Sequence, residues 1–435
     1  MTSLRILVYP HAMELGGSQL NALELAGAVR DLGHEVVVLG EDGPLLAVVE
    51  KLGLKRLQLD PRRRRPSLAT TRRLRSLIGS LDLDIVHGYE WPPGIEAAAA
   101  AYPGRRAAAV CTVMSMAVAP FLPVHLPLVV GTRALQERAA RRRPGPVHLI
   151  EPPVDVAENA PGHPVDEFRA HYGLAADQTT AVPGQIITVG VVCRLVQELK
   201  LEGILTAIDA IAKLARERPI RLVITGDGDA HARVEQRAAE ANAYAGWRAV
   251  VLTGQLLDPR PVYAAADVML GMGGSALRAL AFGKPLVVQG ERGFWELLTP
   301  DSSALFLHQG WYGLGDGTGG EERLTTALRR LLDDPALRAE LGHYGRSLAV
   351  ERFSLQRAAA VQTEIYLQAI ARRRDPGMLG QTLAGAHSAA GVFEHVVRRR
   401  FQRLSGTWVR DDFNAVTLAG AALDTRSSNS SKRPR

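Results

Sequence analysis

The stretch DVMLGMGGSALRALAFGKPLVVQG, residues 267–290, decides the fold of this chain. Its first apolar run is interrupted by three glycines between positions 271 and 274, continues from Ala276 with helical spacing and stops at Gly283 before a second apolar run. This order is typical of a strand–helix–strand unit whose two strands lie parallel. We therefore expect the glycine-rich turn at the carboxyl end of a strand, directly before a helix.

Similar units repeat over most of the chain. Short runs rich in Val, Ile and Leu alternate with longer amphipathic segments, which predicts parallel sheets covered by helices on both faces. The alternation stops in a polar stretch with Pro and Gly between about 155 and 184 and then starts again. The predicted strands are 5–9, 34–40, 55–59, 84–89, 107–113 and 127–131 in the first half, and 186–193, 221–226, 249–254, 267–271 and 285–289 in the second.

This pattern predicts an α/β protein with two doubly wound halves and a polar linker. We expect the first domain over 1–160, the linker over 161–184 and the second domain over 185–353. Helices are expected to continue to about 373. The basic extension 376–435 ends in LDTRSSNSSKRPR, which cannot bury enough apolar surface to be ordered throughout.

Composition narrows the class of protein. A chain of 435 residues with 46% hydrophobic residues is typical of a soluble globular protein of two or three domains. The net charge of +7 comes mainly from arginine clusters, which suit either anionic partners or solvated faces. Cys111 and Cys193 lack metal-binding spacing, which favours a reducing compartment and predicts a cytoplasmic protein. No aromatic platforms or recognition module indicate nucleic-acid binding.

Two glycine-rich turns are candidate anion sites. In an open parallel sheet, ligands bind at the carboxyl ends of the strands, where helix N-termini present amides and the positive end of the helix dipole. Gly16 and Gly17 form the first turn. Gly273 and Gly274 form the second, with Ser275 as the expected N-cap. Neither turn has the spacing of a dinucleotide or phosphate-loop motif, and both also suit ordinary tight turns.

A diphosphate at such a turn also needs fixed positive charge. The segment CRLVQELK places Arg194 and Lys200 just after the predicted strand 186–193. Both side chains can reach the carboxyl edge of the sheet and provide the counter-charge that a metal ion supplies elsewhere. The same spacing is also compatible with two surface cations at the end of a strand.

These segments together resemble a glycosyltransferase of the GT-B fold, most similar to the large retaining, family 4-like group that uses nucleotide sugars. The resemblance covers residues 4 to about 370 and is most specific in the second half. It is carried by GGSQLNALELAGAVRDLGHEVVVLG from residue 16, VGVVCRL from 189, LVITGDGDAHARVEQRA from 222, DPRPVYAAADVMLGMGGSALRALAFGKPLVV from 258 and LLDDPALRAELGHYGRSLAVERFS from 331.

The resemblance implies two Rossmann-like domains that face a cleft, with the acceptor bound by the first and the donor mainly by the second. A crossover helix over 354–375 is expected to return to the first domain. The implied reaction transfers a sugar, with retention, from a nucleotide diphosphate sugar to a small-molecule, glycan or lipid acceptor. The resemblance implies no metal and no cofactor besides this donor substrate.

The resemblance also assigns roles to residues. Arg194 and Lys200 match the catalytic pair that holds the donor diphosphate, and Glu296 matches a glutamate that follows the donor-site strand. As an alternative, Glu296 is an ordinary residue on a surface helix. The predicted donor-binding residues are Gly16, Gly17, Gly226, Gly273, Gly274, Ser275, Arg278 and Glu296.

This chain departs from the family at two donor contacts. The group usually carries two glutamates, one for the sugar and one for the ribose, and here Leu270 and Arg278 take their places. Neither side chain can accept a hydrogen bond from a hydroxyl. Arg278 therefore adds charge to the diphosphate site, or faces solvent in a divergent enzyme, or marks a noncatalytic nucleotide-sugar-binding protein. A nucleotide-sugar epimerase on the same fold is a further alternative.

A second departure affects the first domain. Many relatives keep a histidine near the end of the strand 107–113, where this chain has Met114 or Ser115. His87 lies near the end of the preceding strand, 84–89, and Glu90 directly follows it. We expect both to line the pocket for the acceptor or the donor sugar. A structural histidine in the core is the simpler alternative for His87.

The segment 392–404 has the pattern of a helix that lies on a membrane. Phe393, Val397, Phe401 and Leu404 share one helical face, with arginines around them. This pattern suits peripheral contact with an anionic membrane, at its inner face in a cytoplasmic protein. It suits packing against the protein itself equally well.

Overall fold

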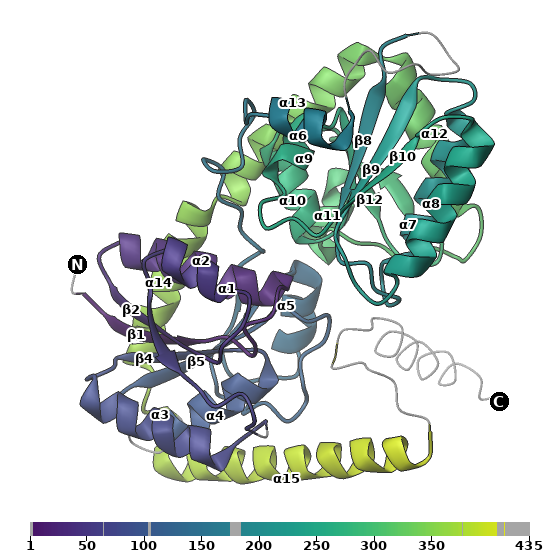
Figure 1. Cartoon of the computed structure of the whole chain (residues 1–435). Helices are drawn as coiled ribbons and strands as arrows, with labels where there is room; N and C mark the ends of the chain where they lie inside the picture. The colour runs from purple at the N-terminus through teal and green to yellow at the C-terminus, as the bar shows by residue number, and fades with distance from the viewer. Residues whose placement is uncertain are drawn as a thin grey trace, which may run out of the picture. The chain divides into compact units, whose positions relative to one another are not determined.

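The computed structural model describes residues 3–63, 65–102, 106–174, 184–375, 377–406 and 413. The chain divides into two compact units. Unit 1 contains the residues up to 152 and those from 356 onward, and unit 2 contains residues 153–355. Each unit is built around a sheet of mainly parallel strands with helices on its faces (Figure 1).

The sheet of unit 1 is entirely parallel. Its strand order is β3-β2-β1-β4-β5-β6-β7, so the direction of winding changes between β1 and β4. The described strands are β1 (Arg5–Tyr9), β2 (Glu35–Gly40), β3 (Lys55–Gln58), β4 (Ile85–Tyr89), β5 (Ala108–Val113), β6 (Leu128–Val130) and β7 (Val147–Leu149). Every residue of β4 and β5 is buried, as expected for strands covered on both faces.

Helices cover both faces of this sheet. They are α1 (Gly17–Asp31), α2 (Leu46–Lys51), α3 (Leu68–Ser80), α4 (Trp91–Ala101), α5 (Arg133–Ala140), α14 (Leu355–Ala371) and α15 (Gly377–Leu404). The chain returns to unit 1 along α14, which lies within the predicted crossover helix 354–375.

Unit 2 has the same architecture. Its strand order is β10-β9-β8-β11-β12-β13, with a change in the direction of winding between β8 and β11. Only β13 runs antiparallel to its neighbour in this described sheet. The strands are β8 (Ile187–Val192), β9 (Ile220–Thr225), β10 (Val250–Gly254), β11 (Val268–Gly271), β12 (Leu286–Gln289) and β13 (Trp295–Leu297).

The helices of unit 2 include one inside the predicted linker. They are α6 (Asp166–Tyr172), α7 (Leu201–Leu214), α8 (His231–Ala245), α9 (Arg260–Ala265), α10 (Gly274–Ala281), α11 (Ser303–Gln309), α12 (Gly320–Asp333) and α13 (Pro335–Arg352). Phe168 of α6 packs against Val223 and Val262, so the segment belongs to the core of unit 2. The predicted α/β architecture of two Rossmann-like halves with a helical C-terminal part is confirmed. Among the described residues, no helix has the length and apolar character needed to cross a membrane.

Arg346 connects the first residues of unit 2 to α10, the helix that follows the glycine-rich turn. Arg346 of α13 donates to the carbonyl of Val156 at 2.9 Å, to that of Asn159 at 3.0 Å and to that of Ala281, the last residue of α10, at 2.6 Å. A guanidinium suits this task because its donors form a rigid fork. The position of α10 therefore depends on α13.

We predict that Arg346→Met lowers the free energy of unfolding of unit 2 by about 2 kcal/mol, because three carbonyls lose a charged donor. Urea unfolding measures the loss. Arg329→Met is the matched control, since Arg329 pairs with Glu217 through side chains that are 54% and 59% exposed. A surface pair of this kind contributes about 0–1 kcal/mol. Equal losses in the two variants would contradict the role given to Arg346.

Candidate functional site

The carboxyl edge of the unit 2 sheet carries the predicted donor residues of the second domain, whereas Gly16 and Gly17 lie in unit 1. β8 and β11 are neighbours at the point where the winding reverses, which is where open α/β sheets bind ligands. Arg194 follows β8 and is exposed. Lys200 is half-buried and is the N-cap residue of α7. The turn at 271–274 follows β11.

The surroundings of Lys200 disfavour its charge. Burial lowers the pKa of Lys200 to about 8, and the positive charge of Arg194 makes a smaller contribution in the same direction. The side chain of Gln289, from the end of β12, donates to the carbonyl of Lys200 at 3.2 Å. The backbone is thus fixed where two like charges lie close together. The sequence did not single out Gln289, whose only signal is its place at the end of a predicted strand.

Gly226 is required by close backbone packing. Its φ is +139°, and a Cβ there would overlap the carbonyl oxygen of Cys193. Beside it, the amide of Leu195 donates to the carbonyl of Asp227 at 2.9 Å, and the amide of Ala230 donates to that of Leu195 at 2.8 Å. The loop after β9 therefore supports the loop that carries Arg194. A donor contact by Gly226 stays a prediction.

The expected N-cap of α10 is wrong. The N-cap is Gly273, whose φ of +56° favours glycine and whose amide donates to the carbonyl of Trp311 at 2.7 Å. Ser275 lies within the first turn, and its hydroxyl donates to the carbonyl of Met272 at 3.0 Å. The amides at the start of α10 nevertheless follow the turn, as predicted.

Arg278 reaches back along α10. A Cβ on Gly274, one turn earlier, would lie 3.5 Å from Nη1 of Arg278, so the guanidinium lies beside the first turn of the helix. The side chain is half-buried, and its charge opposes the effect of burial on the pKa of Tyr263, which is raised. This position suits the interpretation in which Arg278 adds positive charge near the turn.

The other two donor-site positions differ in exposure. Leu270 is 0% exposed and belongs to the core of unit 2, so its side chain faces away from solvent. Glu296 is exposed on the edge strand β13, opposite Val288 of β12. The alternative that put Glu296 on a helix is therefore wrong, and its contact with the donor stays a prediction.

Glu90 has an unusual backbone at the carboxyl edge of the unit 1 sheet. It directly follows β4 with φ 67° and ψ 173°, a region that is essentially restricted to glycine. Its carboxylate accepts from the hydroxyl of Ser18 at 2.9 Å, the amide of Met114 at 3.0 Å and the hydroxyl of Ser115 at 2.7 Å. Glu90 thus joins the start of α1 to the loop after β5.

The glycines of the first turn lie beside this carboxylate's partners. Gly16 is the N-cap of α1, and Gly17 is its first residue, directly before Ser18. A Cβ on Gly16 would overlap the side chain of Gln19, whereas a Cβ on Gly17 would meet nothing within 4 Å. The space beside Gly17 is open, which is compatible with the close approach of a ligand.

His87 is not at a surface. It is 0% exposed, with Nδ1 2.8 Å from the hydroxyl of Tyr366 and Nε2 2.7 Å from the hydroxyl of Thr112. Its side chain therefore joins β4 and β5 to α14, and the expectation that it lines a pocket is corrected in favour of the structural alternative. Complete burial lowers its pKa from 6.5 to about 3.

Arginines near residue 60, read from the sequence as either solvated or partner-binding, instead form an internal network. Arg63 and Arg65 both pair with Glu41, which follows β2, and the side chain of Arg63 is 6% exposed. Tyr9, at the end of β1, donates to Glu96 at 2.7 Å, and Arg63 donates to the Tyr9 hydroxyl at 3.4 Å. The network fills part of the carboxyl edge of unit 1 with paired charges.

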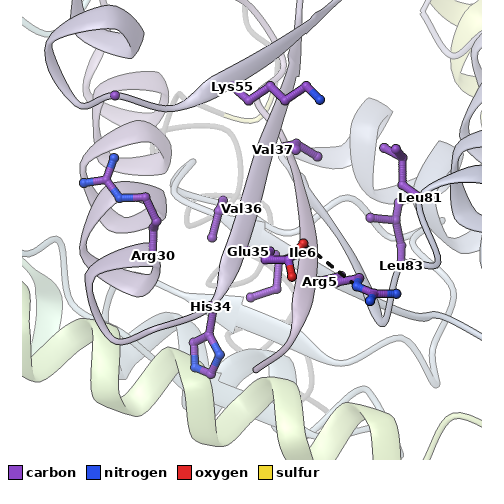
Figure 2. A pocket seen from close by; sticks show the side chains of 11 residues that line it. Arg5, Ile6, Arg30, His34, Glu35, Val36, Val37, Lys55, Leu81 and Leu83 are labelled. Atoms are coloured by element: carbon purple, nitrogen blue, oxygen red, sulfur yellow. Dashed lines mark ion pairs between the residues drawn. The ribbon is translucent and has the colours of Figure 1, made fainter. Parts of the chain in front are cut away.

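A pocket of about 400 Å³ lies at the opposite, amino edge of the unit 1 sheet (Figure 2). Its charged residues are already paired in part, since Arg5 contacts Asp82 at 2.6 Å and Glu35 at 3.9 Å. His34 lies at the edge nearest α14, where Thr363 is 3.4 Å from its Nε2. Within unit 1, this pocket lies at the edge opposite the turn of Gly16 and Gly17. In the described part of the chain, no group of three or more His, Cys, Asp or Glu side chains is placed to hold a metal ion.

Two winding reversals, each with a glycine-rich turn, and a helix that returns to the first unit define the GT-B class. Residues 15–158 match the model described as Glycosyltransferase Family 4, and residues 186–334 match Glycosyl transferases group 1. The chain belongs to the family 4-like glycosyltransferases of the GT-B fold.

Named relatives cover part of the chain. It is 29% identical to 2-deoxystreptamine glucosyltransferase of Streptomyces kanamyceticus over 51% of this chain and 53% of that protein. It is 29% identical to MMP alpha-(1->4)-mannosyltransferase of Mycolicibacterium hassiacum over 40% of this chain and 42% of that protein. The chain thus matches about half the length of these relatives.

Solved structures support the fold over most of the chain. A glycosyltransferase from Rickettsia africae has a TM-score of 0.68 and 15% identity, covering 85% of this chain and 99% of that one. Anabaena Alr3699/HepE in complex with UDP has a TM-score of 0.65 and 16% identity, covering 84% of this chain and 100% of that one.

We predict that His87 makes stability depend on pH. The unfolded chain binds a proton at this histidine below pH 6.5, whereas the folded chain does so only near pH 3. The free energy of unfolding should therefore fall as the pH decreases through this window, by at most about 1.4 kcal/mol per pH unit from this residue. The free energy of unfolding, measured with urea between pH 7 and pH 4, should change less per pH unit in His87→Gln than in the wild type. The control His171→Gln, on the surface of α6, should show the same change per pH unit as the wild type. An unaltered slope in His87→Gln would contradict the assignment.

We predict that Glu90→Gly is more stable than Glu90→Ala by about 1 kcal/mol or more, because alanine retains the backbone strain and glycine does not. Both variants lose the same carboxylate contacts, so their difference in urea unfolding isolates the backbone. Glu137, exposed within α5, provides the control pair, in which glycine should be less stable than alanine by about 1 kcal/mol. If alanine were the more stable variant at position 90 as well as at position 137, the backbone at Glu90 would not be strained.

Proposed function

We propose that this protein transfers a sugar from a nucleotide diphosphate sugar to an acceptor, with retention at the anomeric carbon. The observation that carries the proposal is the pair of cations, Arg194 and Lys200, at the winding reversal of unit 2. The amides that begin α10 follow the neighbouring strand β11, and the Arg278 guanidinium lies beside them. Amides and cations in this arrangement suit a diphosphate.

The chemistry requires stabilisation of the leaving group. As the bond from the anomeric carbon to the diphosphate breaks, the sugar acquires oxocarbenium character and the diphosphate acquires negative charge. Donors that are already in place stabilise this charge without reorganisation. Arg194 and Lys200 supply the counter-charge, and we propose that no metal ion is needed. The Anabaena protein was solved with UDP and with UDP-glucose, which supports a nucleotide sugar as the donor here.

We place the acceptor at unit 1, near Glu90 and the open space beside Gly17. A buried network of paired charges, in which Arg63 and Arg65 contact Glu41, borders this edge, and the acceptor is a small molecule, a glycan or a lipid. We also place the protein in the cytoplasm, with residues 392–404 in peripheral contact with the inner face of the membrane. The two cysteines are unpaired, which supports a reducing compartment.

A second candidate function is noncatalytic binding of a nucleotide sugar. It is supported by the two donor-site positions at which this chain lacks the glutamates of its family. Leu270 is buried in the core, and the Arg278 side chain cannot accept a hydrogen bond from a hydroxyl. Calorimetry with a panel of nucleotides, followed by product detection with donor and cell extract, separates the two functions. Binding with sugar transfer supports the enzyme, and binding without turnover supports the second candidate. Isomerised donor without acceptor would indicate an epimerase.

We predict that Arg194→Ala and Lys200→Ala each weaken the binding of a nucleoside diphosphate by about 1.5–3 kcal/mol, roughly tenfold to hundredfold, because each loses a charged hydrogen bond. Wild-type affinity should also decrease as the pH rises through 8, where Lys200 loses its proton. This pH step should be absent from Lys200→Ala. Titration calorimetry between pH 7 and pH 9 measures both effects.

Lys213→Ala is the matched control, because Lys213 lies near the other end of α7, where it is exposed and pairs with Glu321 at 2.5 Å. This variant should bind as the wild type does. Unchanged affinity in both Arg194→Ala and Lys200→Ala would refute the diphosphate site.

A further inference from the structure

Helix α15 is attached to unit 1 by one face. The hydroxyl of Ser388 donates to the carbonyl of Phe121 at 2.6 Å. One turn later Gly391 lies against the side chain of Phe121, where a Cβ would collide. The ring of His395 then packs on Trp91 and Phe121, with centroid distances of 5.5 Å and 5.3 Å. Ser388, Gly391 and His395 thus lie on one face of α15, which we call the docked face.

The opposite face is apolar and exposed. At about 100° per residue, the positions half a turn away from the docked face fall on a single stripe, which we call the outward stripe. Its residues are Leu379 (76% exposed), Leu383 (62%), Phe393 (72%), Val397 (49%), Phe401 (71%) and Leu404 (81%). The stripe follows the helix for roughly 38 Å at 1.5 Å per residue. Figure 1 shows α15 as one long helix along unit 1.

Single exposed apolar side chains are ordinary in soluble proteins, but six large ones on one helical face, separated in the middle only by Ala386 and Ala390, indicate an interaction surface. The attachment of α15 does not explain this row, because Ser388, Gly391 and His395 lie on the other side of the helix. A sequence that needed only to pack on unit 1 has no requirement for leucine and phenylalanine here. The stripe therefore has a partner other than the docked face.

The charges beside the stripe identify the chemistry of that partner. Helix α15 contains four arginines and one acidic residue, Glu394. Arg398 and Arg400 are exposed and flank the stripe on its two sides, and Arg403 is exposed one turn after Arg400. Over residues 398–403 the apolar stripe therefore lies between arginines. This arrangement is suited to a bilayer with anionic headgroups, where the stripe enters the acyl boundary and the guanidinium groups meet phosphates.

We propose that the outward stripe of α15 is a membrane-binding surface and that its partner is an anionic lipid bilayer. The surface begins at Leu379, well before the segment 392–404 that the sequence suggested. The helix lies in the plane of the headgroups, and its docked face holds unit 1 against the bilayer. The residues of this surface are different from the cations of unit 2, so the membrane proposal can be tested independently of the proposed glycosyl transfer.

The test is sedimentation of the full chain with vesicles. Vesicles of phosphatidylcholine with about 30% phosphatidylglycerol should carry the protein down, and vesicles of phosphatidylcholine alone should do so much less. Raising the salt from about 0.05 M to about 0.5 M should release it in part. The triple variant Phe393→Ser, Phe401→Ser, Leu404→Ser should bind the anionic vesicles at least about tenfold more weakly. The double variant Arg398→Gln, Arg400→Gln should bind anionic vesicles more weakly than the wild type, and its weak binding to vesicles of phosphatidylcholine alone should not change.

Leu257→Ser is the matched control, since Leu257 is 91% exposed in unit 2 and lies outside the stripe. This variant should bind vesicles as the wild type does. The substituted stripe residues face solvent, so all variants should keep the thermal unfolding midpoint and the nucleotide affinity of the wild type.

Three outcomes overturn the proposal. The first is wild-type protein that does not sediment with anionic vesicles, and the second is equal binding by the wild type and the triple variant. The third is a dimer that becomes a monomer in the triple variant, by sedimentation velocity, with no vesicle binding by either form. In that case the stripe joins two copies of the chain.

Discussion

Burial of the Lys200 side chain is the constraint on which the carboxyl edge of unit 2 depends. Burial, and to a smaller extent the charge of Arg194, lowers the pKa of Lys200 to about 8. The backbone still holds the pair in place, because Gln289 fixes the carbonyl of Lys200 and the loop after β9 supports Leu195. An anion with two phosphates would stabilise the charged form of Lys200, since an opposite charge close to a buried ammonium favours its protonation. The local charge therefore favours the binding of a diphosphate.

Most of the fold could be predicted because its strands are buried on both faces. Runs such as β4 and β5 are buried throughout and mostly apolar, and such runs leave a clear pattern in the sequence. The pattern missed β7 and β13, which have three residues each with a polar residue, His148 or Glu296, between two apolar ones. The equally short β6 was predicted because all three of its residues are apolar. Helix α6 was missed for another reason. Its sequence is polar apart from one buried phenylalanine, Phe168, so only tertiary packing reveals that it belongs to unit 2.

The site could be predicted only where local sequence determines it. The pair of cations was found because both residues belong to one short loop after a strand. Ser275 was misplaced because Gly273, with a backbone that favours glycine, takes the N-cap position. The partner of His87 is Tyr366, 279 residues further along the chain, and no local pattern contains such a contact. The strain at Glu90 is likewise invisible in the sequence, since it arises from the backbone that joins β4 to α4.

Unit 1 contains both the first and the last segments of the chain to be synthesised. A ribosome releases the strands of unit 1 first, then all of unit 2, and only then α14, which belongs to unit 1. Until that helix arrives, His87 has no phenolic partner and that part of the sheet is uncovered. The unit that is synthesised first is thus completed last, and a chain that stops anywhere in unit 2 leaves it unfinished.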